Sequence, residues 1–274
     1  MISPDLKNTN RSFFSWYREL LLVLTQRNLK RRYRGSFLGI YWSLFNPLFM
    51  TVVYAAIFSQ NFIKQNFYSS IREYFLATLT GLLVINFFSS STAQALPSIV
   101  DNGTIVNKIR LPLSVFPLST IGANIFQLLM GGFPVLLIVT VFSSGNWLDA
   151  LLNASALFLP LIGLIMVCTG VGMLLGCLYV FFRDLSYFYE LITFLLLFSS
   201  PIFYPKEIMP EFIREKLLIF NPLLSIIESI RQISLSGESP ELLLIFKSLL
   251  SGAIVLTIGI VAFNSLQSKF MDLL

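Results

Sequence analysis

Long stretches without a charged residue constrain this chain more than any other feature. Residues 35–63, 74–100 and 111–148 contain no Asp, Glu, Lys or Arg. Charged residues make up 12% of the sequence, against about 25% in soluble domains. A segment inside a bilayer must satisfy its own backbone hydrogen bonds, so it folds as a helix or joins a closed barrel. Because these runs show little alternation of apolar and polar residues, we expect an all-α integral membrane protein.

We expect six membrane-spanning helices. About 20 apolar residues cross a hydrocarbon core about 30 Å thick, so the uncharged run 111–148 is too long for one span. Pro112 and Pro117 should break its start, and a kink is expected near Gly131–Pro134. Pro47 should kink the first span or end its first part. The expected spans are 37–62, 74–100, 117–142, 150–182, 185–204 and 248–268.

A basic segment precedes the first span. Eight of the 19 Lys and Arg residues lie before residue 35, which predicts a cytoplasmic N-terminus. Six spans would place the C-terminus on the same side. Residues 13–32 carry apolar residues at helical spacing and predict an amphipathic interface helix, which is either a plain anchor or also presents cations to a partner. The expected division is a cytoplasmic region 1–36, without a cleaved signal peptide, and a six-span transmembrane domain 37–274.

The segment from about 205 to 240 is expected to form a re-entrant helical hairpin between spans five and six. Its apolar stretches are too short to cross the bilayer. In the second stretch, Leu223, Ile226 and Ile230 share one helix face, while Glu228 and Arg231 can pair at i and i+3. Because irregular backbone in a membrane must be covered or line a cavity, we interpret this hairpin as a candidate outer gate.

The residue inventory argues against chemistry on a substrate. The chain has no histidine, no phosphate-binding glycine loop and no cluster of metal-ligand residues. Cys168 and Cys177 lie nine residues apart in one apolar segment, too far along a helix to form a disulfide. We therefore expect no enzymatic activity, no metal and no cofactor in this chain. The basic residues suit anionic membrane lipid or an acidic partner rather than nucleic acid.

Four sequence blocks carry a family resemblance. Residues 32–39, Arg-Tyr-Arg-Gly-Ser-Phe-Leu-Gly, followed by Trp42 and Asn46-Pro47-Leu48, resemble the signature of membrane subunits of ABC-type polysaccharide exporters. Blocks at 108–117, 182–205 and 221–231 agree in order and spacing, so the resemblance covers about residues 14–268. It implies a homodimeric permease of the cytoplasmic (inner) membrane that exports lipid-linked O-antigen, capsule or teichoic acid chains. A separate ATPase subunit would bind ATP and Mg.

The resemblance also implies site residues near the cytoplasmic face. The turn at Leu38 and Gly39 would meet the lipid-pyrophosphate end of the substrate. Arg31, Arg32 and Arg34 would contact phosphate, because guanidinium groups match phosphate oxygens; anchoring at the inner face is the alternative. The expected ATPase-docking residues, on the N-terminal helix and the loop 101–110, are Trp16, Arg18, Arg27, Lys30, Asn107, Lys108 and Arg110.

Further residues are implied along the path. Rings expected to line it, rather than face lipid or pack helices, are Tyr41, Trp42, Tyr54, Phe58, Tyr187, Phe194 and Phe198. The expected outer-gate residues are Pro201, Tyr204, Asn221, Pro222, Glu228 and Arg231. Glu190 is the carboxylate well inside a span, where it either reaches the interface and pairs, for example with Arg183, or lines the path. Arg183 and Asp184 are expected to form a structural pair.

Three other functions remain open from the residues. One is an ABC exporter of a small hydrophobic molecule or lipid. A second is an ATP-independent carrier or channel, which predicts buried ionisable relays and inverted halves; neither is visible in the sequence. A third is a membrane scaffold that transports nothing.

Overall fold

The protein is all-α. A computed structural model describes residues 13–58, 63, 68–106, 108, 111–236 and 240–269, and within these ranges there is no β-strand. The helices are α1 (Phe13–Tyr33), α2 (Trp42–Ile57), α4 (Ile71–Ala95), α5 (Gly103–Val106), α6 (Val115–Gln127), α7 (Phe133–Ser143), α8 (Trp147–Ala156), α9 (Phe158–Phe181), α10 (Leu185–Ser199), α11 (Glu211–Phe220), α12 (Pro222–Leu235) and α13 (Leu242–Leu266).

Five helical stretches in the described ranges are long and apolar enough to cross a membrane. They are Gly39–Ile57, Ile71–Ala95, Val115–Ser143, Trp147–Phe181 and Leu242–Lys269. α10 is apolar but has 15 residues, about 22 Å at 1.5 Å per residue. It ends at Ser199 rather than at the expected Tyr204, because Pro201 disfavours helical backbone at the preceding residue. The six-span count therefore stays a prediction.

Two prolines expected to disturb the spans have different effects. α2 runs through Pro47, so the alternative in which this proline ends a first helical part is wrong. The expected irregularity in the third span is present as a π-helical turn, Leu128–Gly132, between α6 and α7. Pro134 follows it in the first turn of α7, where its missing N–H matters least.

The helices α9 and α13 form the most closely packed pair. A Cβ atom built on Gly170 would lie 2.3 Å from the carbonyl oxygen of Val255, and one on Gly259 would lie 2.2 Å from that of Gly170. Seven residues earlier in each helix, a Cβ atom on Gly163 or Gly252 would likewise lie too close to a backbone oxygen of the other helix. Glycine at these four positions lets the two backbones touch, as at many helix crossings in membranes.

The segment before α13 folds as two helices that meet at Asn221. The side chain of Asn221 caps α12 by accepting a hydrogen bond from the Leu223 N–H at 3.1 Å. The apolar side of α12 is fully buried at Ile226 and Ile230, and the helix packs against α4, α7, α9 and α13. A helical hairpin is thus present, while its re-entrant position in a bilayer stays a prediction.

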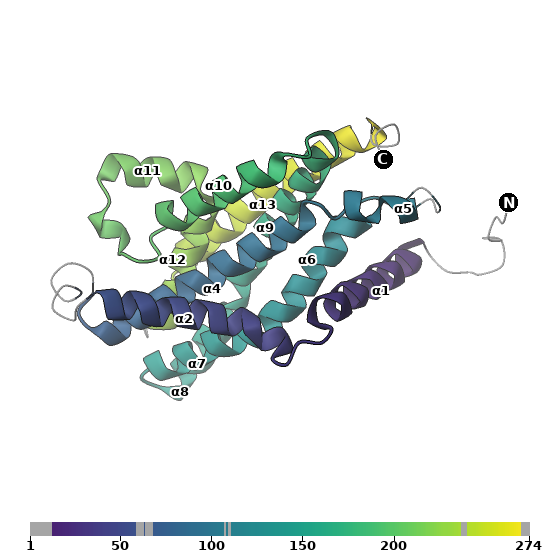
Figure 1. The fold of residues 1–274 in the computed structure, drawn as a ribbon. Coiled ribbons are helices and arrows are strands. Elements are labelled where there is room, and N and C mark those ends of the chain that lie inside the picture. The colour runs from purple at the N-terminus through teal and green to yellow at the C-terminus, as the bar shows by residue number, and fades with distance from the viewer. Residues whose placement is uncertain are drawn as a thin grey trace.

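The bundle has two distinct ends. Figure 1 shows the first turn of α1, the short α5 and the last turn of α13 at one end, with α11 at the other. We call these the α5 end and the α11 end. The helix α1 lies beside α6 and runs in the same direction. The first turn of α1 and the last turn of α13 therefore lie at the same end of the bundle, while the cytoplasmic position of both termini stays a prediction.

Candidate functional site

Polar side chains hold α1 against α6. The hydroxyls of Tyr17 and Ser114 lie 3.0 Å apart, and Thr25 Oγ1 donates to the Ser119 carbonyl at 3.3 Å. Asn28 Nδ2 donates to Ser119 Oγ at 3.3 Å. The stretch Val115–Ser143 has 29 residues, about 43 Å of helix, which is more than the hydrocarbon core needs. The first turns of this stretch therefore need not lie in the hydrocarbon core, and they carry the polar contacts with α1.

Arg32 links three helices through one hydrogen-bond chain. Its Nη1 donates to Asn124 Oδ1 at 3.1 Å and to the Gln127 side-chain oxygen. Asn124 Nδ2 in turn donates to Gln94 Oε1 at 3.3 Å. Arg32 on α1 is therefore tied to α6, and through it to α4. Of the three arginines expected to contact phosphate, this one already has acceptors within the chain.

Arg31 lines a cavity beside this chain of hydrogen bonds. The cavity has a volume of about 340 Å³ and lies between α1, α4, α6 and the turn that follows α4. The Arg31 side chain is exposed and has no hydrogen-bond or ion-pair partner among the described residues. Arg34 is exposed and does not line the cavity. We call this space the arginine cavity; its lining residues are Asn28, Arg31, Arg32, Ala93, Gln94, Pro97, Ser98, Asp101, Asn102 and Thr120.

The turn between α1 and α2 depends on two glycines. Gly35 has φ +77° and Gly39 has φ +51°, a left-handed conformation that other residues adopt at a cost. Ser36 Oγ accepts a hydrogen bond from the Gly39 N–H at 3.0 Å. Phe37 between them is fully exposed. The expected turn at Leu38 and Gly39 is present, and its entrance role stays a prediction.

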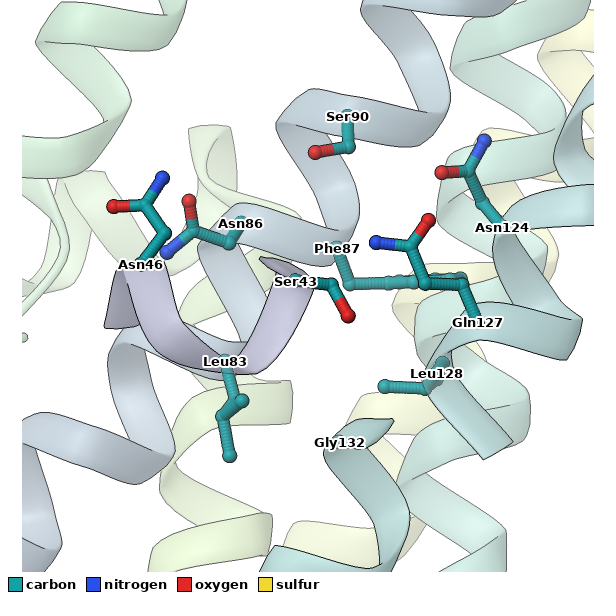
Figure 2. Close-up of a pocket in the computed structure, with 10 residues that line it drawn as sticks. All are labelled: Ser43, Asn46, Leu83, Asn86, Phe87, Ser90, Asn124, Gln127, Leu128 and Gly132. Carbon is teal, nitrogen blue, oxygen red and sulfur yellow. The ribbon is translucent and has the colours of Figure 1, made fainter. Parts of the chain in front are cut away.

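A small polar pocket lies between α2, α4 and the end of α6. Its volume is about 60 Å³, and Figure 2 shows Ser43, Asn46, Asn86, Ser90 and Gln127 pointing into it. The sequence analysis did not select these residues. A usable signal was present, because uncharged polar side chains recur every four residues along α4, at Asn86, Ser90 and Gln94.

The two segments expected to dock an ATPase are joined in the structure. Arg27 Nη2 of α1 donates to Asn102 Oδ1 at 2.7 Å. Burial, followed by the positive charge of Arg31, lowers the pKa of Arg27 from its ordinary value. Trp16 is half-buried, whereas Arg18, Lys30 and Lys108 are exposed. Asn107 and Arg110 lie outside the described residues. The docking role itself stays a prediction.

Some of the expected path rings come together near the α11 end. The ring centroids of Tyr54 on α2 and Phe203 lie 3.9 Å apart. The ring centroid of Phe203 lies 6.3 Å from that of Phe198, and the centroid of Phe198 lies 4.9 Å from that of Phe194. Phe203, which the sequence analysis missed, therefore bridges α2 and α10. Of the other expected rings, Phe58 packs against Tyr74 with centroids 6.1 Å apart, and the exposed ones are Tyr41, Trp42 and Tyr187.

Arg231 forms a clamp at the α11 end instead of the expected pair with Glu228. Its Nε and Nη2 donate to the Ala77 carbonyl at 3.1 and 2.8 Å, and Nη2 also donates to the Ile202 carbonyl at 2.8 Å. Nη1 donates to the Pro201 carbonyl. Glu228 pairs with Lys206 at 3.2 Å. The expectation of a Glu228–Arg231 pair is wrong, because buried carbonyls from two segments surround the guanidinium.

The remaining outer-gate residues also come together. Asn221 Nδ2 donates to Ser200 Oγ at 2.9 Å, and Tyr204 donates its hydroxyl hydrogen to the Phe198 carbonyl at 2.6 Å. Pro222 occupies the first turn of α12, where proline is well tolerated. Tyr204, Asn221, Glu228 and Arg231 thus each bond to the segment 198–206, which contains Pro201. The role of the six residues in gating stays a prediction.

Comparison with known proteins identifies the family. The family profile described as ABC-2 type transporter matches residues 19–235. The chain belongs to the ABC-2 type transporter membrane family. Members are membrane transport subunits rather than enzymes, and the family implies an ATPase partner. The resemblance seen in the sequence blocks is confirmed at this level.

Three similar ABC-2 relatives are O-antigen export system permease proteins RfbA. One from Klebsiella pneumoniae is 33% identical over 257 residues, covering 93% of this chain and 95% of the relative. Another from Klebsiella pneumoniae is 31% identical over 265 residues with the same coverage. One from Myxococcus xanthus is 30% identical over 228 residues, covering 82% of this chain and 84% of the relative.

Proposed function

We propose that this chain is the transmembrane subunit of an ATP-driven exporter that moves a lipid-linked polysaccharide of O-antigen type across the cytoplasmic membrane. It works as a homodimer with a separate ATPase that binds ATP and Mg. In this scheme the α5 end faces the cytoplasm, which agrees with the excess of positive charge that α1 carries. The names of the relatives support the substrate class.

The arginine cavity is the observation that carries this proposal. Arg31 leaves its guanidinium without a partner among the described residues at the edge of a space of about 340 Å³. A guanidinium donates paired hydrogen bonds that match a phosphate group. Gln94 and Asn28 add uncharged polar groups to the same wall. Such a site suits a pyrophosphate better than it suits an uncharged hydrophobic molecule.

The exposed faces of α2 and α10 support the homodimer. α2 buries only Pro47 and Thr51 within the chain, and α10 buries only Tyr189. Both helices carry exposed rings, among them Trp42 and Phe194. A second copy that faces these helices would enclose an aromatic path, on which the C–H faces of sugars stack without a fixed register.

Transport in proteoliposomes tests the function. The permease, its ATPase and a lipid-linked oligosaccharide are reconstituted together, and the labelled glycan that reaches the lumen is measured with and without ATP. We expect ATP-dependent uptake that falls at least about tenfold in Arg31→Gln, because a charge-assisted hydrogen bond is lost. Lys269→Gln, which removes an exposed cation that does not line the arginine cavity, serves as the matched control.

Two outcomes would contradict the proposal. Uptake that persists without ATP would favour a carrier or channel. ATP-dependent export of a hydrophobic dye, with no uptake of the lipid-linked glycan, would favour an exporter of small hydrophobic molecules. Dimer assembly is checked in parallel by native mass spectrometry, and Arg31→Gln should leave it intact.

A further inference from the structure

A second cavity lies next to the arginine cavity and differs from it in chemistry. It has a volume of about 460 Å³ and lies between α4, the end of α9 and α10. Eight of its eleven lining residues carry a hydroxyl, an amide or a carboxylate. These eight are Ser89, Ser90, Gln94, Tyr179, Ser186, Tyr189, Glu190 and Thr193. We call this space the hydroxyl cleft. Its size lies within the range of about 300–1,000 Å³ that small-molecule sites occupy.

Glu190 is the charged group of the hydroxyl cleft. Neither oxygen of its side chain has a hydrogen-bond or ion-pair partner among the described residues. The alternative in which Glu190 pairs with Arg183 is not realised, and the expected Arg183–Asp184 ion pair is also absent from the described structure. A carboxylate on an apolar membrane helix is costly unless it faces water or a polar ligand. In this cleft the Glu190 carboxylate can face water or a polar ligand.

The donors and acceptors in the cleft suit a polyol. Thr193 Oγ1 donates to the Tyr189 carbonyl at 3.0 Å, so its oxygen lone pairs remain available to accept. Gln94 Oε1 already accepts from Asn124, so its amide N–H groups remain available as donors. The Glu190 carboxylate offers two strong acceptors for hydroxyl hydrogens, and Tyr179 adds an aromatic ring. A sugar unit supplies both hydroxyl hydrogens and oxygens to such a set.

The two cavities share one wall and have opposite electrostatic preferences. Ala93, Gln94 and Pro97 line both. The arginine cavity carries Arg31 and Arg32 against the one carboxylate of Asp101, so its net positive charge attracts an anion, whereas Glu190 in the hydroxyl cleft repels one. A ligand with an anionic end joined to uncharged hydroxyl-bearing units therefore fits in only one orientation. Its anionic end lies against α1, and its hydroxyl-bearing units lie between α4 and α10.

We propose that the hydroxyl cleft is a sugar subsite, in which Glu190 and Gln94 hydrogen-bond the sugar units next to the pyrophosphate of the substrate. This inference rests on the proposed function and adds a binding site to it. Glu190 is a specificity-determining residue in this scheme: it distinguishes a lipid pyrophosphate that carries sugar from one that carries none.

Binding of two probes to the permease in nanodiscs tests the subsite. One probe is polyprenyl diphosphate without sugar, and the other is the lipid-linked oligosaccharide extracted from the cells that produce this chain. We expect Glu190→Gln to weaken binding of the oligosaccharide probe about tenfold and to change binding of polyprenyl diphosphate less than twofold. Ser186→Ala should show the same selectivity with a loss of about twofold to threefold. Glu211→Gln, an exposed carboxylate on α11, is the matched control.

The outcomes separate the subsite from the proposed function. If wild-type protein binds both probes equally, or if Glu190→Gln weakens both by the same factor, the sugar subsite is wrong while the proposed function stands. If wild-type protein binds neither probe, or Arg31→Gln alters neither affinity, the proposed function itself fails. Selective loss in Glu190→Gln, together with loss of both probes in Arg31→Gln, supports both.

Discussion

The α9–α13 seam and the helix α10 show two ways in which a helix joins this bundle. Along the seam, glycines bring backbone against backbone at four positions. α10 instead buries one residue, Tyr189, whose hydroxyl donates to the Ser89 carbonyl at 3.2 Å and also contacts the Thr92 hydroxyl. The seam has no room to shift, whereas Tyr189 is the one fully buried side chain of α10 and Leu185, Leu196 and Leu197 are partly buried against the bundle.

The difference indicates where the molecule can move. Close backbone packing without cavities resists displacement, so α9 and α13 act as a fixed scaffold. The cavities described above border α1, α4, α6 and α10, and they reach α9 only in its last turn, at Tyr179. Helices with few buried contacts have low local stability and supply the moving parts of proteins. We therefore expect α10 to move more readily than α9 or α13.

The largest predicted effect comes from filling the seam. Gly170→Leu places a side chain where Val255 already lies 2.3 Å from the Cβ position, so the helices must separate. We expect a loss of at least about 3 kcal/mol in the free energy of unfolding, measured by denaturant titration in detergent. Gly145→Ala, where no atom lies within 4 Å, should be close to neutral. Equal effects of the two variants would contradict the rigid-seam description.

The next largest effect is expected at the clamp of the α11 end. Arg231→Gln leaves the carbonyls of Ala77, Pro201 and Ile202 short of donors, which should cost about 2–3 kcal/mol in the free energy of unfolding. Arg214→Gln removes an exposed pair with Glu211 at 3.4 Å and should cost less than about 1 kcal/mol. If Arg231→Gln and Arg214→Gln lower the free energy of unfolding by the same amount, the carbonyl clamp does not stabilise the fold.

A smaller effect is expected from loosening α10. Tyr189→Phe keeps the ring but removes its hydrogen bonds to Ser89 and Thr92, a loss of about 1 kcal/mol. Amide hydrogen exchange should accelerate in α10 and stay unchanged in α9 and α13. Tyr187→Phe, at an exposed ring on the same helix, controls for the substitution. Uniform acceleration in all three helices would show that α10 is not separately attached.

The smallest effect is expected at the Lys206–Glu228 ion pair. Lys206 is 39% exposed at its side chain and Glu228 is 12% exposed, so solvent partly screens the pair. Lys206→Gln should lower the free energy of unfolding by less than about 1 kcal/mol, and the difference from wild type should shrink further as salt is raised. A larger loss in the free energy of unfolding, unchanged by salt, would show that this pair stabilises the fold as strongly as the buried contacts do.

The elements that depend on local pattern were predictable from the sequence. Charge-free runs indicated the all-α membrane fold, and apolar residues at helical spacing over residues 13–32 predicted a helix where α1 lies. The glycines near 131 and the proline after them marked the irregular turn in the third span. These features depend on residues within one or two helical turns, so the sequence alone contains them.

The contacts that build the site were not predictable in the same way. Local spacing favoured Glu228 as the partner of Arg231, but the guanidinium binds the carbonyl of Ala77, 154 residues away. Arg32 was interpreted as a phosphate contact, yet it hydrogen-bonds Asn124, 92 residues away. Many acceptors compete for a buried guanidinium, and only the packing of helices distant in sequence decides which of them lie within reach.

The hydroxyl and amide contacts between α1 and α6 have a mechanical consequence. Each such hydrogen bond can be exchanged for one to water at a net cost of only about 0.5–1.5 kcal/mol, so the contacts of Tyr17, Thr25 and Asn28 can break one at a time. The apolar cluster that Leu24 forms with Val115 and Phe116 is different, because separating it exposes buried apolar surface. A force applied to α1 would therefore act first on the polar contacts and on the cavity that Arg31 lines, while the cluster around Leu24 keeps the helix attached to α6.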